Sequence, residues 1–180
     1  MNSTEVLQSL EKWTSHYIEE LDNYSDEQLG RKPAEDAWSL GQMYVHLIET
    51  ANHLQLANVD KCRALSEEAV LSAAEMPVKN EAGEAVFAMG GFPPVRIVVP
   101  ASARPDPAQA ESKRQLVEGL QAVLRRAGEL EPQLGSIPAH VKVAHPRLGG
   151  MNAEEWFALV EMHYRHHLLQ KERLHAFIAG

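Results

Sequence analysis

The segment Met151–Gly180, MNAEEWFALVEMHYRHHLLQKERLHAFIAG, carries the strongest structural signal in this sequence. At 3.6 residues per helical turn, its apolar side chains fall on one stripe of a long helix. Two histidines, His163 and His167, lie on the same stripe one turn apart. The stripe consists of Trp156, Leu159, Val160, His163, His167, Gln170, Leu174, Phe177 and Ile178. The segment therefore predicts an amphipathic helix with two imidazoles on its buried face.

These two imidazoles need polar partners, because a buried polar group without a hydrogen bond costs about 1–3 kcal/mol. One interpretation of His163 and His167 is a pair of core histidines that bond to facing helices or to water. The other is a divalent metal site, because imidazoles at positions i and i+4 project from neighbouring turns and can share one ion. The spacing leaves both interpretations open, and a third ligand elsewhere would decide between them.

Three further segments show helical periodicity. The first runs from Ser3 to Leu21, and the second starts at the capping pair Ser39 and Gln42 and runs to about Leu65. A third is expected to start at the pair Asp106-Pro107 and to end near Leu130. The last helix is preceded by a capping pair of its own, Asn152 and Glu155. We predict an all-α fold, a four-helix bundle in a single domain over residues 1–180.

The first connection, Asp22 to Pro33, is expected to be a loop with at most one short turn, and two further irregular connections separate the later helices. The longer one, Ser72 to Pro107, is broken by prolines and glycines and contains one β-like run, Val95 to Val99. A connection of this length either covers the mouth of a pocket or only packs on the surface. The stretch from His145 to Gly150, HPRLGG, is predicted to be a second loop.

Composition excludes several classes of protein. The formal net charge of −8, with Lys and Arg spread thinly, argues against nucleic-acid binding. The sequence has no apolar run of about 18 residues, so we expect neither a signal peptide nor a membrane span, and a cytoplasmic location. The single cysteine, Cys62, fits a reducing compartment. It neighbours Lys61 and Arg63, which favour a thiolate, but a small, half-buried core residue is the preferred interpretation.

The second predicted helix contributes further polar candidates. His46 lies about 100° from the centre of its apolar stripe, so periodicity places it on the flank, although a flank position can still point inward in a bundle. His53, two turns further on, is expected to face solvent. Glu49 lies between the two histidines and either orients a ligand or is a surface charge.

Two stretches together resemble the DinB-like superfamily. The first is WSLGQMYVHL, Trp38 to Leu47, after a loop ending in Lys32-Pro33. The second runs from HPRLG at His145 through Trp156 to His163, His167 and Gln170. The run GFPP, Gly91 to Pro94, is similar to members of the YfiT-like branch. The resemblance implies a four-helix bundle that holds a divalent metal, zinc or nickel, through His46, His163 and His167, with His166 beside the site.

The resemblance also implies an activity. Relatives resemble transferases that use a low-molecular-weight thiol on an electrophilic small molecule, and they often look like homodimers. Three histidine ligands leave positions open for substrate, and Glu49, Tyr164 and Gln170 are candidates to orient water or thiol. The alternative is a metal-binding bundle without catalysis, a stress-related or binding module. A di-iron site is not expected, because the only Glu-x-x-His pair, Glu172 and His175, is off the stripe.

Overall fold

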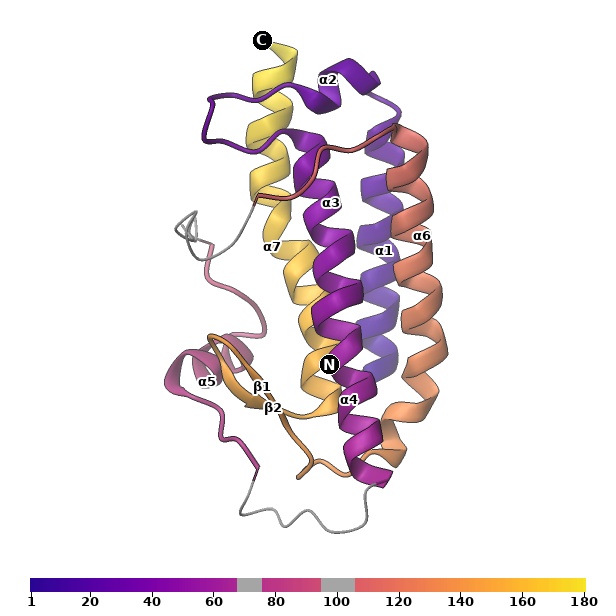
Figure 1. The fold of residues 1–180 in the computed structure, drawn as a ribbon, viewed down its shortest axis with the longest axis vertical. Coiled ribbons are helices and arrows are strands. Elements are labelled where there is room, and N and C mark those ends of the chain that lie inside the picture. The colour runs from indigo at the N-terminus through magenta and orange to yellow at the C-terminus, as the bar shows by residue number, and fades with distance from the viewer. Residues whose placement is uncertain (68–75, 95–105) are drawn as a thin grey trace.

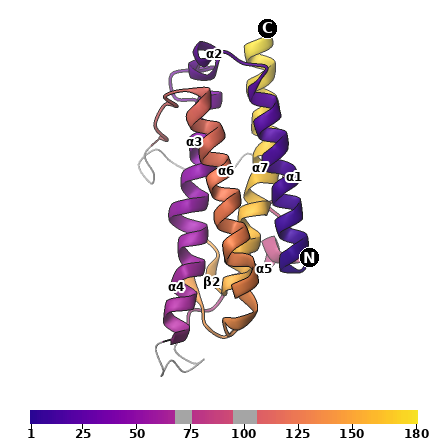
Figure 2. The same cartoon turned by 90° about the vertical axis from the view of Figure 1, so that its right-hand side faces the viewer.

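The computed structural model describes residues 1–67, 76–94 and 106–180 (Figure 1). Its long helices are α1 (Ser3–Leu21), α3 (Leu40–Thr50) continuing into α4 (Leu56–Glu67), α6 (Lys113–Leu130) and α7 (Ala153–Ala179). They lie side by side along the long axis, with α1 and α7 running in one direction and α3–α4 and α6 in the other (Figures 1 and 2). The all-α prediction is confirmed.

The predicted capping boxes start the two helices that carry the three histidines. Ser39 Oγ accepts a hydrogen bond from the backbone N–H of Gln42 (3.1 Å), whose side-chain oxygen accepts one from Ser39 N–H (3.0 Å). Asn152 and Glu155 exchange the same pair of bonds at the start of α7, at 2.9 and 3.0 Å. Each box satisfies two of the backbone donors that a helix start leaves without partners.

The predicted start of the third helix at Asp106-Pro107 is wrong. Helix α6 begins at Lys113, and its N-cap is Ser112, which accepts from the backbone N–H of Gln115 at 3.2 Å. The Asp106 carboxylate instead accepts a bond from the indole Nε1 of Trp38 (2.8 Å). The carbonyl of Pro107 accepts from the side chain of Gln42 (2.7 Å). These tertiary bonds hold the segment across the start of α3, so Asp106 is not available as a cap.

The second helix is not one regular helix. Its middle, Ala51–Gln55, is a π-helix in which the N–H of Leu56 donates to the carbonyl of Ala51, five residues back. Gln55 is buried, and its side-chain nitrogen donates to the backbone oxygen of Leu159 on α7 (3.2 Å). A regular α-helix with Leu47 and Ala51 inside would also bury Leu54, whereas the structure buries Gln55 and Leu56 and leaves Leu54 half-buried. The extra residue in the π turn shifts the second half of the helix by one residue position, which is a rotation of about 100° around the helix axis.

The described part of the long connection is more regular than predicted. It contains α5 (Glu81–Ala88), whose N-cap Asn80 accepts from the N–H of Gly83 at 2.9 Å. A Cβ at Gly83 would lie 2.3 Å from the carbonyl oxygen of Leu148, so glycine lets α5 pack against that backbone. The predicted β-like run Val95 to Val99 lies outside the described residues. A short helix α2 (Asp26–Gly30) follows α1, where at most one turn is expected.

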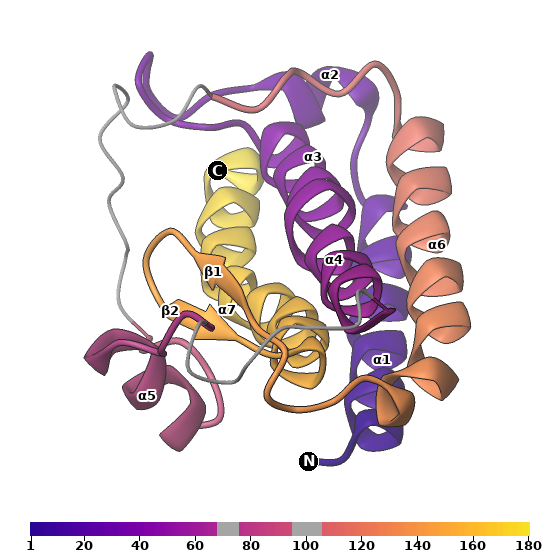
Figure 3. The same cartoon turned by 60° about the horizontal axis from the view of Figure 1, so that its bottom comes forward.

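The second predicted loop is partly a β-hairpin. Strands β1 (Val143–His145) and β2 (Gly149–Met151) pair antiparallel, with Val143 opposite Met151. Gly149 has a positive φ of 77°, and it forms a bridge with Lys79 of the segment before α5. The hairpin and α5 therefore form a small unit beside α7, outside the bundle (Figure 3). Strands of three residues are too short to produce a recognisable alternation in the sequence.

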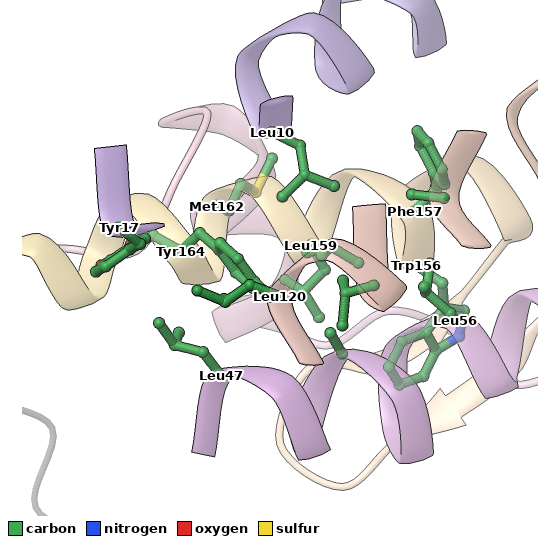
Figure 4. Packing of buried hydrophobic residues seen from close by; sticks show 14 of the residues in the cluster. Leu10, Tyr17, Leu47, Leu56, Leu120, Trp156, Phe157, Leu159, Met162 and Tyr164 are labelled. Atoms are coloured by element: carbon green, nitrogen blue, oxygen red, sulfur yellow. The ribbon is translucent and has the colours of Figure 1, made fainter. Parts of the chain in front are cut away.

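The core lies between the long helices (Figure 4). Tyr17 of α1, Leu47 of α3, Leu120 of α6 and Leu159 of α7 are all buried there. Cys62 is also fully buried, its Sγ lies 3.9 Å from the carbonyl oxygen of Met151, and burial raises the pKa of its thiol to about 11. It is therefore a protonated core residue and not a reactive thiolate.

None of the helices within the described ranges combines the length and the apolar composition that crossing a membrane requires.

Candidate metal centre

Three histidines from two helices converge at one point in the bundle. Nε2 of His163 on α7 lies 3.0 Å from Nε2 of His46 on α3 and 3.1 Å from Nε2 of His167. The ring of His163 stands nearly perpendicular to the other two, at 88° and 86°. The residues are buried, with exposed fractions of 5% for His46 and 8% for each of the others. His46, a flank residue by periodicity, therefore points inward.

Hydrogen bonding among the three rings does not by itself account for this geometry. The Nε2 atom of His163 faces two other Nε2 atoms, but a neutral imidazole nitrogen carries either one hydrogen or one lone pair. Three nitrogens at 2.0–2.1 Å from one tetrahedral zinc ion stand about 3.3 Å apart, close to the separations here. The donor set therefore fits a divalent ion. In the part of the chain that the structure describes, these three residues are the group of His, Cys, Asp and Glu side chains close enough to share one.

The opposite ring nitrogens of two of these histidines are held by neighbours on the same helix. Nδ1 of His46 lies 3.0 Å from the hydroxyl of Thr50, and Nδ1 of His167 lies 2.9 Å from the side-chain oxygen of Gln170. When these oxygens accept from Nδ1–H, the lone pair of each ring is on Nε2, where a metal would bind. Gln170, one of the three residues that the sequence offered to orient water or thiol, therefore contacts His167 at the ring nitrogen opposite the cluster. Thr50 was missed, and its i+4 spacing from His46 is the signal that could have found it.

Two aromatic side chains lie beside the histidines. The ring centroid of Trp38 is 5.0 Å from that of His46, and the ring of Phe92 is 6.5 Å from His163 and 5.4 Å from His166. Both aromatic residues are half-buried. His166 lies next to His167, with centroids 5.5 Å apart, and remains outside the converging set. Burial, and then the charge of Arg173, lower the pKa of His166.

Phe92 is held near the site through α7. Arg165 donates to the carbonyl of Gly90 (2.6 Å) and forms an ion pair with the buried carboxylate of Glu161 (3.0 Å). Glu161 also accepts from Ser9 Oγ (2.9 Å) and from the indole of Trp13 (3.1 Å), both on α1. The segment before Phe92 is thereby fixed to a network that ties α1 to α7.

The other sequence candidates lie elsewhere. Glu49 and His53 are exposed on the second helix. Tyr164 is fully buried and packs edge-on against Tyr17 at 5.9 Å, on the core side of α7 (Figure 4). Burial raises the pKa of the Tyr164 hydroxyl well above its ordinary value. Of the three candidates proposed to orient water or thiol, the structure brings Gln170 into contact with a histidine of the cluster.

Comparison with protein families agrees with this arrangement. The family model of the DinB superfamily matches residues 9–170. The chain belongs to the DinB superfamily. The match includes the capped start of α3, the three histidines and the whole of the long connection of this DinB superfamily protein, and it ends within α7. No curated protein matched the sequence.

Proposed function

We propose that this DinB superfamily protein binds one divalent metal ion through His46, His163 and His167 and transfers a low-molecular-weight thiol to an electrophilic small molecule. The observation that carries the proposal is the convergence of three Nε2 atoms. That of His163 lies 3.0 Å from that of His46 and 3.1 Å from that of His167. The bonds from Thr50 and Gln170 to the opposite ring nitrogens support it, because they favour the tautomers that a metal needs.

The ligand set favours zinc or nickel and an anionic substrate. Imidazole nitrogens suit either ion, and metal supply usually decides between them. Three neutral ligands leave the full charge of a divalent ion unbalanced and at least one coordination position open. Among the described residues, no carboxylate or cysteine joins the three histidines. A thiolate from a small molecule fits such a position in both charge and ligand preference.

The reaction is a substitution or addition at carbon. When bound, the metal supplies a Lewis acid that favours the deprotonated form of the thiol. The sulfur lone pair forms the new carbon–sulfur bond, and the thiol proton passes to solvent. In a substitution the leaving group departs with its electron pair; in an addition the electron pair of the attacked double bond moves to the neighbouring atom, which takes a proton from solvent. Thr50 and Gln170 keep the imidazoles oriented, and the burial of the rings limits water at the site. Cys62 is not the nucleophile, because it is buried and protonated.

The second candidate is a metal-binding bundle without catalysis. It is favoured by the low exposure of the three histidines, 5–8%, and by their position between α3 and α7, where an ion would join two helices far apart in the sequence. Both candidates require the metal, and only the first requires a thiol and an electrophile.

The first test is metal content, measured by plasma mass spectrometry on untagged protein after incubation with zinc or nickel. We expect close to one ion per chain in the wild type and loss of the ion in His46→Ala and His163→Ala. His53→Ala is the matched control, because His53 is an exposed histidine on the same helix and its loss should leave the metal in place. If the wild type binds no metal, the proposal is wrong and the three histidines are hydrogen-bonded core residues.

The second test is turnover of the loaded protein with glutathione, cysteine or coenzyme A as the thiol and 1-chloro-2,4-dinitrobenzene as the electrophile. We expect thioether formation that requires the metal and disappears in His163→Ala. Metal binding without turnover of any electrophile would favour the non-catalytic bundle.

A further inference from the structure

We propose that Trp38 and Phe92 form an aromatic subsite beside the histidine cluster, and that the electrophile accepted there carries a flat, uncharged group. The inference rests on the proposed function, because it assumes that a metal and an exogenous ligand occupy the histidine cluster. It adds the class of substrate and the residues that select it.

The two aromatic rings contact two different histidines from two different segments. Trp38 precedes α3 and packs against His46 at 5.0 Å, whereas Phe92 follows α5 and packs against His163 at 6.5 Å. The interplanar angles are 59° and 70°, so neither ring stacks flat on its histidine. Both are half-buried, while the histidines are 5–8% exposed. Part of each aromatic side chain therefore remains exposed, although the histidines that it contacts are buried.

The indole of Trp38 and the backbone just before Phe92 are each held by a polar contact outside the cluster. The indole N–H of Trp38 donates to the Asp106 carboxylate at 2.8 Å. Phe92 follows Gly90, whose carbonyl accepts from Arg165 at 2.6 Å. A Cβ at Gly91 would lie 2.9 Å from the Arg165 guanidinium, so the backbone is seated directly on that group. Rings that are already held in place lose little freedom when a ligand binds, which favours recognition.

The chemistry of the subsite selects against charged groups. Aromatic faces attract flat apolar groups through stacking and edge contacts, and they also attract cations. A cation is disfavoured here, because three neutral imidazoles would leave the charge of a bound divalent ion unbalanced beside the histidines that both rings contact. An anion is disfavoured by the negative faces of the rings. The subsite therefore favours an electrophile with an aryl or conjugated, uncharged portion.

The experiment compares two hydroxamates on the zinc-loaded or nickel-loaded protein by titration calorimetry. Benzohydroxamate and acetohydroxamate bind a metal through the same two oxygen atoms and differ in carrying a phenyl or a methyl group. We expect the wild type to prefer benzohydroxamate by about three- to tenfold, the range that aromatic contacts supply. Phe92→Leu and Trp38→Leu should each lose most of this preference while keeping their metal and their affinity for acetohydroxamate.

Phe177→Leu is the control, because Phe177 is a half-buried phenylalanine near the far end of α7 and should leave the preference unchanged. Equal affinity for both compounds in the wild type, or a preference that survives both substitutions, overturns the subsite but leaves metal binding intact. If the loaded protein binds neither hydroxamate, the site does not admit a ligand that would reach the aromatic rings, and the subsite is overturned, whereas the proposed transferase is still decided by the turnover test. If Trp38→Leu does not fold, Phe92→Leu alone decides.

Discussion

Replacing Glu161 with glutamine removes the charge of a buried carboxylate while keeping its shape. The Glu161 side chain is 1% exposed and that of its partner Arg165 is 38% exposed. Oε1 accepts three bonds, from Ser9, Trp13 and Arg165, and Oε2 accepts a fourth from Arg165 at 3.0 Å. In Glu161→Gln an amide nitrogen takes the place of one carboxylate oxygen. This nitrogen is a hydrogen-bond donor, and it then faces one of the donors that the oxygen had accepted from.

The magnitude follows from burial on the two sides of the pair. Breaking a fully buried ion pair costs about 3–5 kcal/mol. Because Arg165 is more than a third exposed, water can solvate its released charge, and we expect a loss of about 2 kcal/mol in the free energy of unfolding. With a urea dependence of about 2 kcal/mol per molar, this moves the unfolding midpoint down by about 1 M.

The assay is urea unfolding followed by circular dichroism, with Glu118→Gln as the control. Glu118 pairs with Arg114 at the same i, i+4 spacing, but the two side chains are 60% and 86% exposed. We expect no measurable change there, because exposed ion pairs contribute little. If Glu161→Gln were as stable as Glu118→Gln, the reasoning from burial would be refuted.

Three further predictions concern other polar groups that are buried or half-buried. Thr50→Val removes the oxygen behind His46 and should weaken metal binding about 10- to 100-fold in a chelator competition, with the fold retained; unchanged affinity would show that Thr50 does not orient the ligand. The hydroxyl of Tyr164 is buried with no hydrogen-bond partner among the described residues, so Tyr164→Phe should be neutral or stabilising. Tyr17→Phe loses a 2.8 Å hydrogen bond and should lower the free energy of unfolding by about 1 kcal/mol in the same urea assay. A larger loss in Tyr164→Phe than in Tyr17→Phe would contradict both assignments. Burial, and then Arg147, lower the pKa of His145 from 6.5 to about 4, so the unfolded chain binds the proton first and stability falls as the pH drops from 6.5 to 4. His145→Asn keeps an acceptor for the turn and should show a shallower loss across that window; identical curves would exclude His145 as a cause.

The sequence predicted those features that depend on neighbours along the chain. The starts of α3 and α7 were correct, because a capping box involves residues three apart and needs no tertiary contact. The HxxxH pair was recognisable for the same reason. His46 was not distinguishable from a flank residue by periodicity, because every residue from Leu40 to Leu47 is buried and the buried surface of α3 extends beyond its apolar stripe. Its place in the cluster was implied only by the family resemblance.

The features that were missed depend on contacts between distant segments. Asp106 carries the local pattern of an N-cap, but its carboxylate binds Trp38, 68 residues away in the sequence. The packing of α5 against the hairpin depends on the close approach of Gly83 to Leu148, which no periodicity reports. The approach of Phe92 to the histidines depends likewise on Arg165 and Gly90. Spacing along the chain does not encode these pairings.

The π turn at Ala51–Gln55 sets the phase between two halves of one continuous helix. The first half directs His46 toward His163, and the second directs Cys62 toward Met151 beside the hairpin. In an unbroken α-helix, one residue fewer would turn everything beyond it by about 100°. Deleting a residue from this turn would restore a regular hydrogen-bond ladder and rotate one half away from its partner. The length of the segment, more than the identity of its side chains, lets one helix serve two surfaces that face in different directions.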